Sequence, residues 1–93
     1  MLSFLPKNPS EIMQELQSKF KERRRSLGYT QKELATRSGV SLGSLKRFES
    51  SGQIALASLL KLALVLECLE DFEGVCPERK KSFESIDEIL SER

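Results

Sequence analysis

The stretch "YTQKELATRSGVSLGSLKRFESSG", residues 29–52, contains two short helical patterns on either side of a glycine. The first begins at Thr30 with "TQKE", in which the threonine and glutamate side chains can accept hydrogen bonds from free backbone amides at a helix start. Gly39 ends this helix, because glycine readily adopts the left-handed conformation that stops a helix. Ser41 can cap the second helix, which "SSG" closes. The pattern therefore predicts two short helices joined by a tight turn.

Helical patterns also lie on both sides of this stretch, and no pattern typical of a strand occurs. Upstream, Asn8 is a good N-cap before Pro9, and apolar residues then recur at helical spacing as far as Gly28. Downstream, "IALASLLKLALVLECL", residues 54–69, predicts a fourth helix that is apolar over most of its circumference, and a last turn follows around Phe72. The sequence therefore predicts an all-α fold.

The composition is that of one small globular domain, with 93 residues of which 39% are apolar and 31% are charged. No apolar run approaches the roughly 20 residues that span a bilayer, and the start "MLSFLPKNPSEI" lacks the features of a signal peptide. We therefore expect a cytoplasmic protein that has no membrane partner.

Cysteine and histidine usage argues against metal sites and catalysis. Cys68 and Cys76 form no CxxC pair and the chain has no histidine, so neither a disulfide framework nor a zinc site is expected. Without histidine, no serine or cysteine has an evident base that would activate it as a nucleophile. The sequence also lacks a glycine-rich phosphate loop. We expect neither enzymatic activity nor a cofactor.

Charge is distributed unevenly along the chain, although the net charge is only +1. Residues 1–54 contain ten Lys and Arg against five Asp and Glu, whereas residues 55–93 contain five against nine. A basic half can attract phosphate, while an acidic half faces solvent or a basic partner. Within "KERRR", Arg23 or Arg25 can contact phosphate, or these residues form only a solvated helix face.

Two helices joined by a turn of three or four residues that contains glycine form a helix-turn-helix, whose second helix enters the major groove of DNA. Leu45 and Phe48 lie on one stripe of this second helix and are expected in the core. The opposite stripe faces outward and contains Gly43, Lys46, Arg47 and Ser50. Lysine and arginine suit the acceptor edge of guanine, and Ser44 can bond to a base or to phosphate. This face therefore has the donors that reading a base sequence requires.

The segment "TQKELATRSGVSLGSLKRFE" resembles the phage-repressor-like helix-turn-helix family, also called the Cro/CI or XRE family, and the resemblance extends from about Leu16 to Phe72. It includes Gln31 at the start of the first helix of the motif and Ala35 at the close helix crossing. The resemblance implies a five-helix, lambda-repressor-like DNA-binding domain.

The resemblance also implies roles for particular residues. Gln31 and Ser41 stand at phosphate-contacting positions, and Gly43, Ser44 and Arg47 stand at positions that face bases. We add Lys46 to the base-contacting residues because of its place on the outward stripe. Glu49 stands where the family commonly carries an acid that pairs with a basic residue of the first helix, which here is Arg24.

The start of the fourth helix departs from the family pattern, which usually has a capping serine or threonine where this chain has Ala55. The change forfeits about 1 kcal/mol unless Ser51 or Gln53 substitutes for the missing cap. We predict Ser51 and Gln53 as further phosphate-contacting residues in this loop.

The fourth helix has more apolar surface than a core of this size is expected to cover. The stripe predicted to face the core contains Leu56, Leu59, Leu60 and Ala63. The predicted dimer or partner surface beyond it contains Leu62, Leu64 and Val65. Two domains in a dimer would read half-sites about one helical turn apart and so require a palindromic site. Alternatively, residues 1–5, or Phe83, Ile86 and Ile89 of the tail, fold back over this surface.

The chain is thus predicted to consist of an N-terminal arm at residues 1–9, a helix-turn-helix DNA-binding domain at residues 10–74 and a helical C-terminal extension at residues 75–93. We expect a sequence-specific transcriptional regulator that binds double-stranded DNA, and in particular a repressor that binds a palindromic operator as a homodimer. The competing hypothesis is an antitoxin-type protein, which binds a partner toxin through its termini and represses its own operon.

Overall fold

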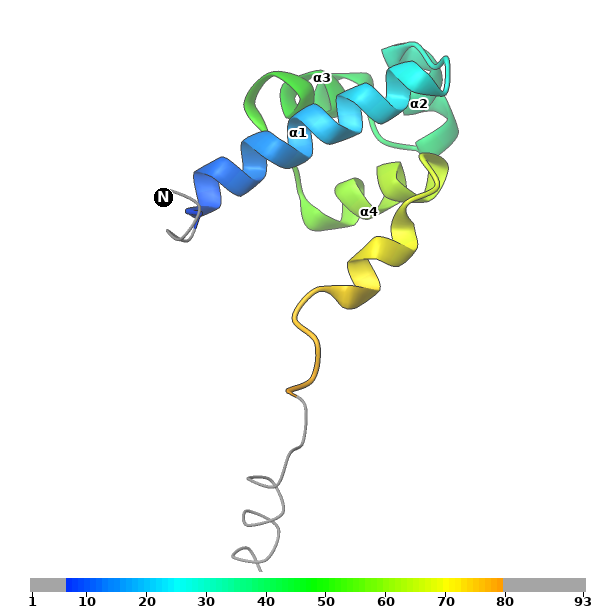
Figure 1. The fold of residues 1–93 in the computed structure, drawn as a ribbon. Helices are drawn as coiled ribbons and strands as arrows, with labels where there is room; N and C mark the ends of the chain where they lie inside the picture. The colour runs from blue at the N-terminus through cyan, green and yellow to red at the C-terminus, as the bar shows by residue number, and fades with distance from the viewer. Residues whose placement is uncertain (1–6, 80–93) are drawn as a thin grey trace, which may run out of the picture.

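A computed structural model describes residues 7–79, in which four α-helices are followed by one 3-10 helix (Figure 1). These helices are α1 (Pro9–Ser26), α2 (Gln31–Ser38), α3 (Leu42–Ser51), α4 (Leu56–Val65) and η2 (Leu69–Gly74). The described part of the chain contains no strand, so the prediction of an all-α fold is confirmed. The predicted helical extension falls mainly on residues 80–93, which lie outside the described residues, as do residues 1–6 of the predicted arm.

The first three helices begin where the local sequence predicts. At the start of α1, the Glu11 N–H donates to Asn8 Oδ1 at 2.8 Å and the Asn8 N–H donates to Glu11 Oε1 at 3.1 Å. Thr30 and Glu33 form the same reciprocal capping box at the start of α2. Ser41 caps α3 through its hydroxyl oxygen. Each of these caps joins residues three positions apart, so local sequence is sufficient to predict it.

Helix α4 is shorter than the predicted helix at residues 54–69. It begins after Ala55, whose side chain makes no capping hydrogen bond, while Ile54 packs half-buried against the core. It ends at Val65, and Glu67 then adopts a left-handed conformation with φ of 63°. The cap position at Ala55 agrees with the predicted start of the helix, whereas its end was predicted too late because apolar residues continue beyond Val65 in a segment that itself packs on the core. The chain resumes as η2.

The core lies where α1 packs on α3 and where α2 packs on both α3 and α4 (Figure 1). The largest side chains that are fully buried are Leu34, Leu45, Phe48, Leu62 and Leu66. The ring of Phe20 in α1 meets Phe48 of α3 edge-on, with 5.6 Å between ring centroids. Phe72 of η2 also contacts Phe20 edge-on, at 6.3 Å. These aromatic contacts join α1, α3 and η2 in one core.

The orientation of α4 corrects two expectations. Leu62 was predicted on the dimer or partner surface, but its exposed fraction is 0%. Leu56 was predicted in the core, but it is 66% exposed. The buried residues of α4 and its cap are Leu59, Leu62, Ala63 and Leu66, which follow the spacing of one helical face. Because α2 packs on α4, the helix is rotated so that Leu62 faces inward and Leu64 is left 64% exposed.

Within residues 7–79, no single helix is long and apolar enough to span a membrane. Helices α3 and α4 taken together have the length and apolar composition of a membrane span, but the pair is bent by 96°.

Candidate nucleic-acid interface

The turn between α2 and α3 consists of Gly39, Val40 and Ser41. Gly39 adopts the left-handed conformation with φ of 79°, and its N–H donates to the Ala35 carbonyl oxygen at 3.0 Å. Val40 is buried, and its N–H donates to the Ser38 hydroxyl oxygen at 3.1 Å. The glycine thus reverses the chain and the valine anchors the turn in the core, which determines how α3 leaves α2.

Helix α3 turns one face to the core and the other to solvent. Leu45 and Phe48 are each only 1% exposed. The exposed residues of α3 before its last turn are Gly43, Ser44, Lys46 and Arg47. The structure therefore brings together, on one solvent-facing surface, the four residues that were predicted to contact bases.

Gly43 leaves the exposed face open in the first turn of α3. A β-carbon at this position would have no atom within 4 Å, so no packing contact inside the protein requires glycine. Gly43 also lies within a regular helix, where glycine costs roughly 0.5 to 1 kcal/mol relative to alanine. The glycine therefore leaves space in which another molecule can approach the α3 backbone closely.

The start of α3 is ordered by two serines. The Ser44 N–H donates to Ser41 Oγ at 3.1 Å, and the Ser41 hydroxyl donates to Ser44 Oγ at 2.9 Å. Both side chains are exposed. The Ser44 hydroxyl hydrogen is thus left to point toward a base or a phosphate oxygen, because Ser44 Oγ acts as the acceptor in this pair.

The end of α3 and the loop to α4 are joined by a second group of hydrogen bonds. Arg47 Nη2 donates to Gln53 Oε1 at 2.5 Å, and the Ser51 hydroxyl donates to the Arg47 carbonyl oxygen at 2.7 Å. The Gln53 N–H donates to Ser51 Oγ at 3.2 Å. Ser51 and Gln53, predicted as phosphate-contacting residues, therefore lie beside the predicted base-contacting Arg47.

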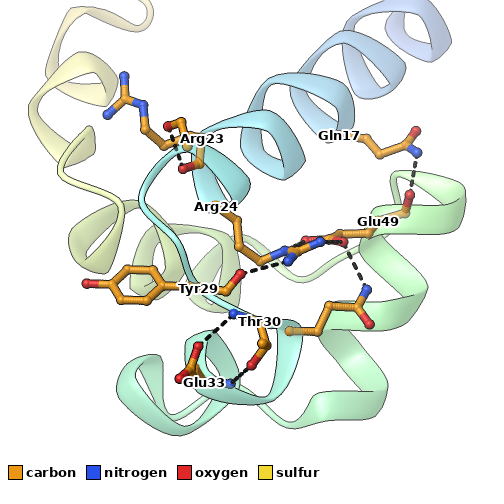
Figure 2. Close-up of polar contacts among 9 residues, drawn as sticks. Gln17, Arg23, Arg24, Tyr29, Thr30, Glu33 and Glu49 are labelled. Carbon is orange, nitrogen blue, oxygen red and sulfur yellow. Dashed lines mark hydrogen bonds and ion pairs between the residues drawn. The ribbon is translucent and has the colours of Figure 1, made fainter.

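A buried ion pair fixes α3 against α1 (Figure 2). Arg24 Nε donates to Glu49 Oε2 at 2.7 Å, and Arg24 Nη2 donates to Glu49 Oε1 at 3.0 Å. Arg24 Nη1 also donates to the Tyr29 carbonyl oxygen at 2.8 Å, in the segment that leads to α2. Arg24 is 7% exposed and Glu49 is 4% exposed, so this is the pair that was predicted from the sequence, in a buried and bidentate form.

Two glutamine side chains complete this network. Gln31 Nε2 donates to Glu49 Oε1 at 2.9 Å, and the Gln17 side chain donates to the Glu49 carbonyl oxygen. Burial raises the pKa of Glu49, but the hydrogen bonds from Arg24 and Gln31 outweigh it and hold the pKa below the usual value. Glu49 is therefore a stable anion whose contacts join α1, α2 and α3 in one arrangement.

Sequence reasoning did not identify the contact of Gln17. A sequence signal for it exists, because Gln17 precedes Arg24 by seven residues and therefore lies on the same face of α1. The partner of Arg23 could not be found in this way. Arg23 Nη1 donates to the Leu66 carbonyl oxygen at 2.7 Å and so satisfies a free carbonyl at the end of α4. This contact gives Arg23 a place within the fold, although Arg23, like Arg25, is exposed.

The exposed polar groups around α3 are of kinds that can bind nucleic acid. Among residues 7–79, no group of three or more potential metal ligands occurs together, and Cys68 and Cys76 are free thiols. The exposed polar groups of α3 and of its flanking loops are hydrogen-bond donors and acceptors with two cations among them. Such groups can bind base edges and phosphates.

Comparison with protein families matches residues 20–72 to a helix-turn-helix model. Searches of curated proteins and of solved structures gave no significant match. The matched segment covers more than half of the chain and contains α2, the glycine turn and α3. The chain therefore belongs to the XRE-type helix-turn-helix family of DNA-binding transcription regulators.

Proposed function

We propose that the protein is a transcriptional repressor that binds a palindromic operator as a homodimer. The observation that carries this proposal is the exposed face of α3, where Ser44, Lys46 and Arg47 lie together. The opposite face of α3 is anchored in the core, and Glu49 ties its end to α1 and α2. Because the helix is held rigidly, its exposed donors can meet base edges in a defined register.

In this proposal, different exposed side chains of α3 contact different groups on the bases. Arg47 donates two hydrogen bonds to O6 and N7 of a guanine, and Lys46 donates to a neighbouring acceptor. Ser44 contacts a base near the start of α3. Gly43 lets the α3 backbone approach the groove without an intervening side chain.

Phosphate contacts hold α3 in the groove. Gln31 and Ser41 lie at the starts of α2 and α3, where free backbone amides and the helix dipole attract anions. The Ser41 hydroxyl hydrogen is bonded to Ser44 Oγ, so the start of α3 would bind phosphate through its backbone amides. Gln31 uses one amide hydrogen on Glu49, and a primary amide has a second hydrogen that can bond to phosphate. The basic balance of residues 1–54 favours the same contacts.

Dimerisation through the end of α4 would place two copies of α3 on successive turns of DNA. Leu64 is 64% exposed and Val65 is half-buried, so these residues support the interface, whereas the buried Leu62 takes no part in it. Symmetry then requires an inverted repeat in the operator. The bound dimer represses transcription by obstructing polymerase.

The alternative of an antitoxin-type protein depends on the chain termini. Residues 80–93 lie outside the described residues, and no feature of residues 7–79 favours a toxin as partner. Repression remains the proposed function, and the experiment below tests the reading of DNA, which both hypotheses include.

The experiment is a selection of the purified protein against random duplex DNA, with an Arg47→Ala variant beside it and salt concentration varied. The wild type should enrich an inverted repeat. Arg47→Ala should lose about 1 to 3 kcal/mol on that repeat and little on random duplex, because the lost contacts are to a base. Fluorescence anisotropy on both duplexes measures this difference.

Gln31→Ala is the matched comparison at a phosphate-contacting position. It should weaken binding to all duplexes by a similar factor, since a phosphate contact carries no sequence information. If the wild type binds only weakly, loses binding steeply with salt and is unaffected by Arg47→Ala, the protein does not read bases. A protein partner would then be the next subject of study.

A further inference from the structure

The guanidinium of Arg47 is held by a residue outside α3. Its Nη2 donates to Gln53 Oε1 at 2.5 Å, across the end of the helix. We propose that Gln53 is a positioning residue, which orients Arg47 toward the base that it reads. This inference rests on the proposed function, in which Arg47 contacts a base, and it replaces the phosphate contact predicted for Gln53 from the sequence.

The loop that carries Gln53 is itself fixed on both sides. Gly52 adopts the left-handed conformation with φ of 80°, and its N–H donates to the Phe48 carbonyl oxygen at 2.8 Å. A β-carbon at Gly52 would lie 3.2 Å from the Met13 carbonyl oxygen, so α1 packs closely on this point of the loop. On the other side, Ile54 packs half-buried against the core. Gln53 is therefore an exposed side chain on an anchored backbone.

Ser51 closes a ring of hydrogen bonds that contains Arg47 and Gln53. Its hydroxyl donates to the Arg47 carbonyl oxygen at 2.7 Å and accepts from the Gln53 N–H at 3.2 Å. A hydroxyl has one hydrogen, and phosphate oxygens only accept. Ser51 thus cannot donate to phosphate while this bond lasts, and its contacts serve to place the Gln53 backbone relative to Arg47.

The hydrogen bond to Gln53 leaves Arg47 able to read a base. A guanidinium has five N–H donors, and guanine takes two of them at O6 and N7. A solvent-exposed arginine side chain loses rotamer freedom when it binds a base. A hydrogen bond that already restrains the side chain, such as the bond to Gln53, reduces this loss. Gln53 should therefore increase the preference for the correct base pair, because it favours one orientation of the donors that remain.

Positioning and phosphate binding by Gln53 predict different results for two substitutions. Gln53→Met keeps the length of the side chain and removes the acceptor for Arg47. Gln53→Glu keeps an acceptor oxygen, but it removes the amide donor and adds a negative charge near the DNA. We would measure the affinity of each variant for the preferred duplex and for a duplex with the Arg47-dependent base pair changed, and take the ratio of the two affinities as discrimination.

For a positioning residue, Gln53→Met should lower discrimination about two- to ten-fold, the range expected for one net hydrogen bond. Gln53→Glu should weaken binding to both duplexes through charge repulsion and keep the wild-type discrimination. In an Arg47→Ala background, Gln53→Met should leave discrimination unchanged, because the side chain that it positions is absent.

Equal weakening of both duplexes by Gln53→Met, with discrimination retained, would overturn the positioning role and favour a phosphate contact. If instead the proposed function is wrong and Arg47 reads no base, the single substitution Arg47→Ala would leave discrimination unchanged. Thermal unfolding of each variant checks that the fold is intact, which is expected since Arg47 and Gln53 are both exposed.

Discussion

Glu49 is a buried anion, and its contribution to the free energy of unfolding should depend on pH. Its carboxylate accepts from Arg24 and Gln31, and these bonds hold its pKa below the ordinary value of 4.5 in spite of burial. A carboxyl group with a lowered pKa in the folded state adds stability that is complete above its ordinary pKa. That stability is lost as the pH falls through the lower pKa of the folded protein.

We therefore expect the free energy of unfolding of the wild type to fall as the pH is lowered below about 4.5. Glu49→Gln should be less stable at neutral pH, because Arg24 is left buried without its counter-charge, and it should lose less stability on acidification. Urea denaturation at a series of pH values measures both curves. Parallel curves would mean that Glu49 does not contribute to the acid sensitivity.

Gly43 lowers the stability of α3 and leaves the exposed face of this helix without a side chain at that position. Because a β-carbon there meets no atom within 4 Å, Gly43→Ala should raise the free energy of unfolding by roughly 0.5 to 1 kcal/mol. The same methyl group should lower affinity for DNA if the α3 backbone approaches the groove closely. Thermal unfolding and a binding titration on the selected operator measure the two effects. An alanine variant that is more stable and binds equally well would remove Gly43 from the interface.

At the scale of whole elements, caps distinguish α4 from the helices before it. Asn8, Thr30 and Ser41 each accept a hydrogen bond from a backbone amide at a helix start, whereas Ala55 has no side-chain oxygen to do so. Ala55 nevertheless has the extended backbone of an N-cap, with φ of −70° and ψ of 145°. The start of α4 is therefore shaped for a cap that the sequence does not supply.

Ala55→Ser should stabilise the protein by about 1 kcal/mol, since the new hydroxyl can accept from a free amide in the first turn of α4. Ala57→Ser is the matched control, because Ala57 is also exposed but lies within the helix, where serine brings no such bond. Chemical denaturation compares the two variants. Similar free energies of unfolding for both would show that the missing cap does not limit stability.

The helix boundaries show where local sequence is sufficient and where it is not. The starts of α1, α2 and α3 depend on a cap and a residue three positions later, and both can be found in the sequence. The end of α4 was misplaced, because Leu66 and Leu69 are apolar residues that pack on the core from outside the helix. Hydrophobic pattern alone does not separate a buried helical residue from a buried residue in a turn.

At the scale of the whole molecule, the proposed dimer depends on the apolar surface at the end of α4. Leu64→Glu should shift sedimentation from dimer to monomer, because a charge would be buried in the interface. It should also weaken binding to an inverted repeat more than binding to a single half-site. Leu56→Glu is the control, since Leu56 is 66% exposed and Leu64 is 64% exposed on the same helix. An intact dimer of Leu64→Glu would remove Leu64 from the interface.

Local sequence is sufficient to predict the helix caps, the glycine turn, and the face of α3 that carries Ser44, Lys46 and Arg47. Each of these features depends on residues within about one or two turns of each other, so spacing along the chain is enough to predict it. The Arg24–Glu49 pair was found through family resemblance, which adds information about contacts between helices.

The burial of individual leucines in α4 depends on how the helices pack, and so do the hydrogen bonds between side chains of different elements. Leu62 faces the core because α2 packs on α4, and the Arg23 side chain of α1 reaches the Leu66 carbonyl oxygen at the end of α4. The contact of Arg47 with Gln53 exists because Gly52 reverses the chain against α1. These outcomes depend on the relative rotation and distance of packed helices, which periodicity within one helix does not encode.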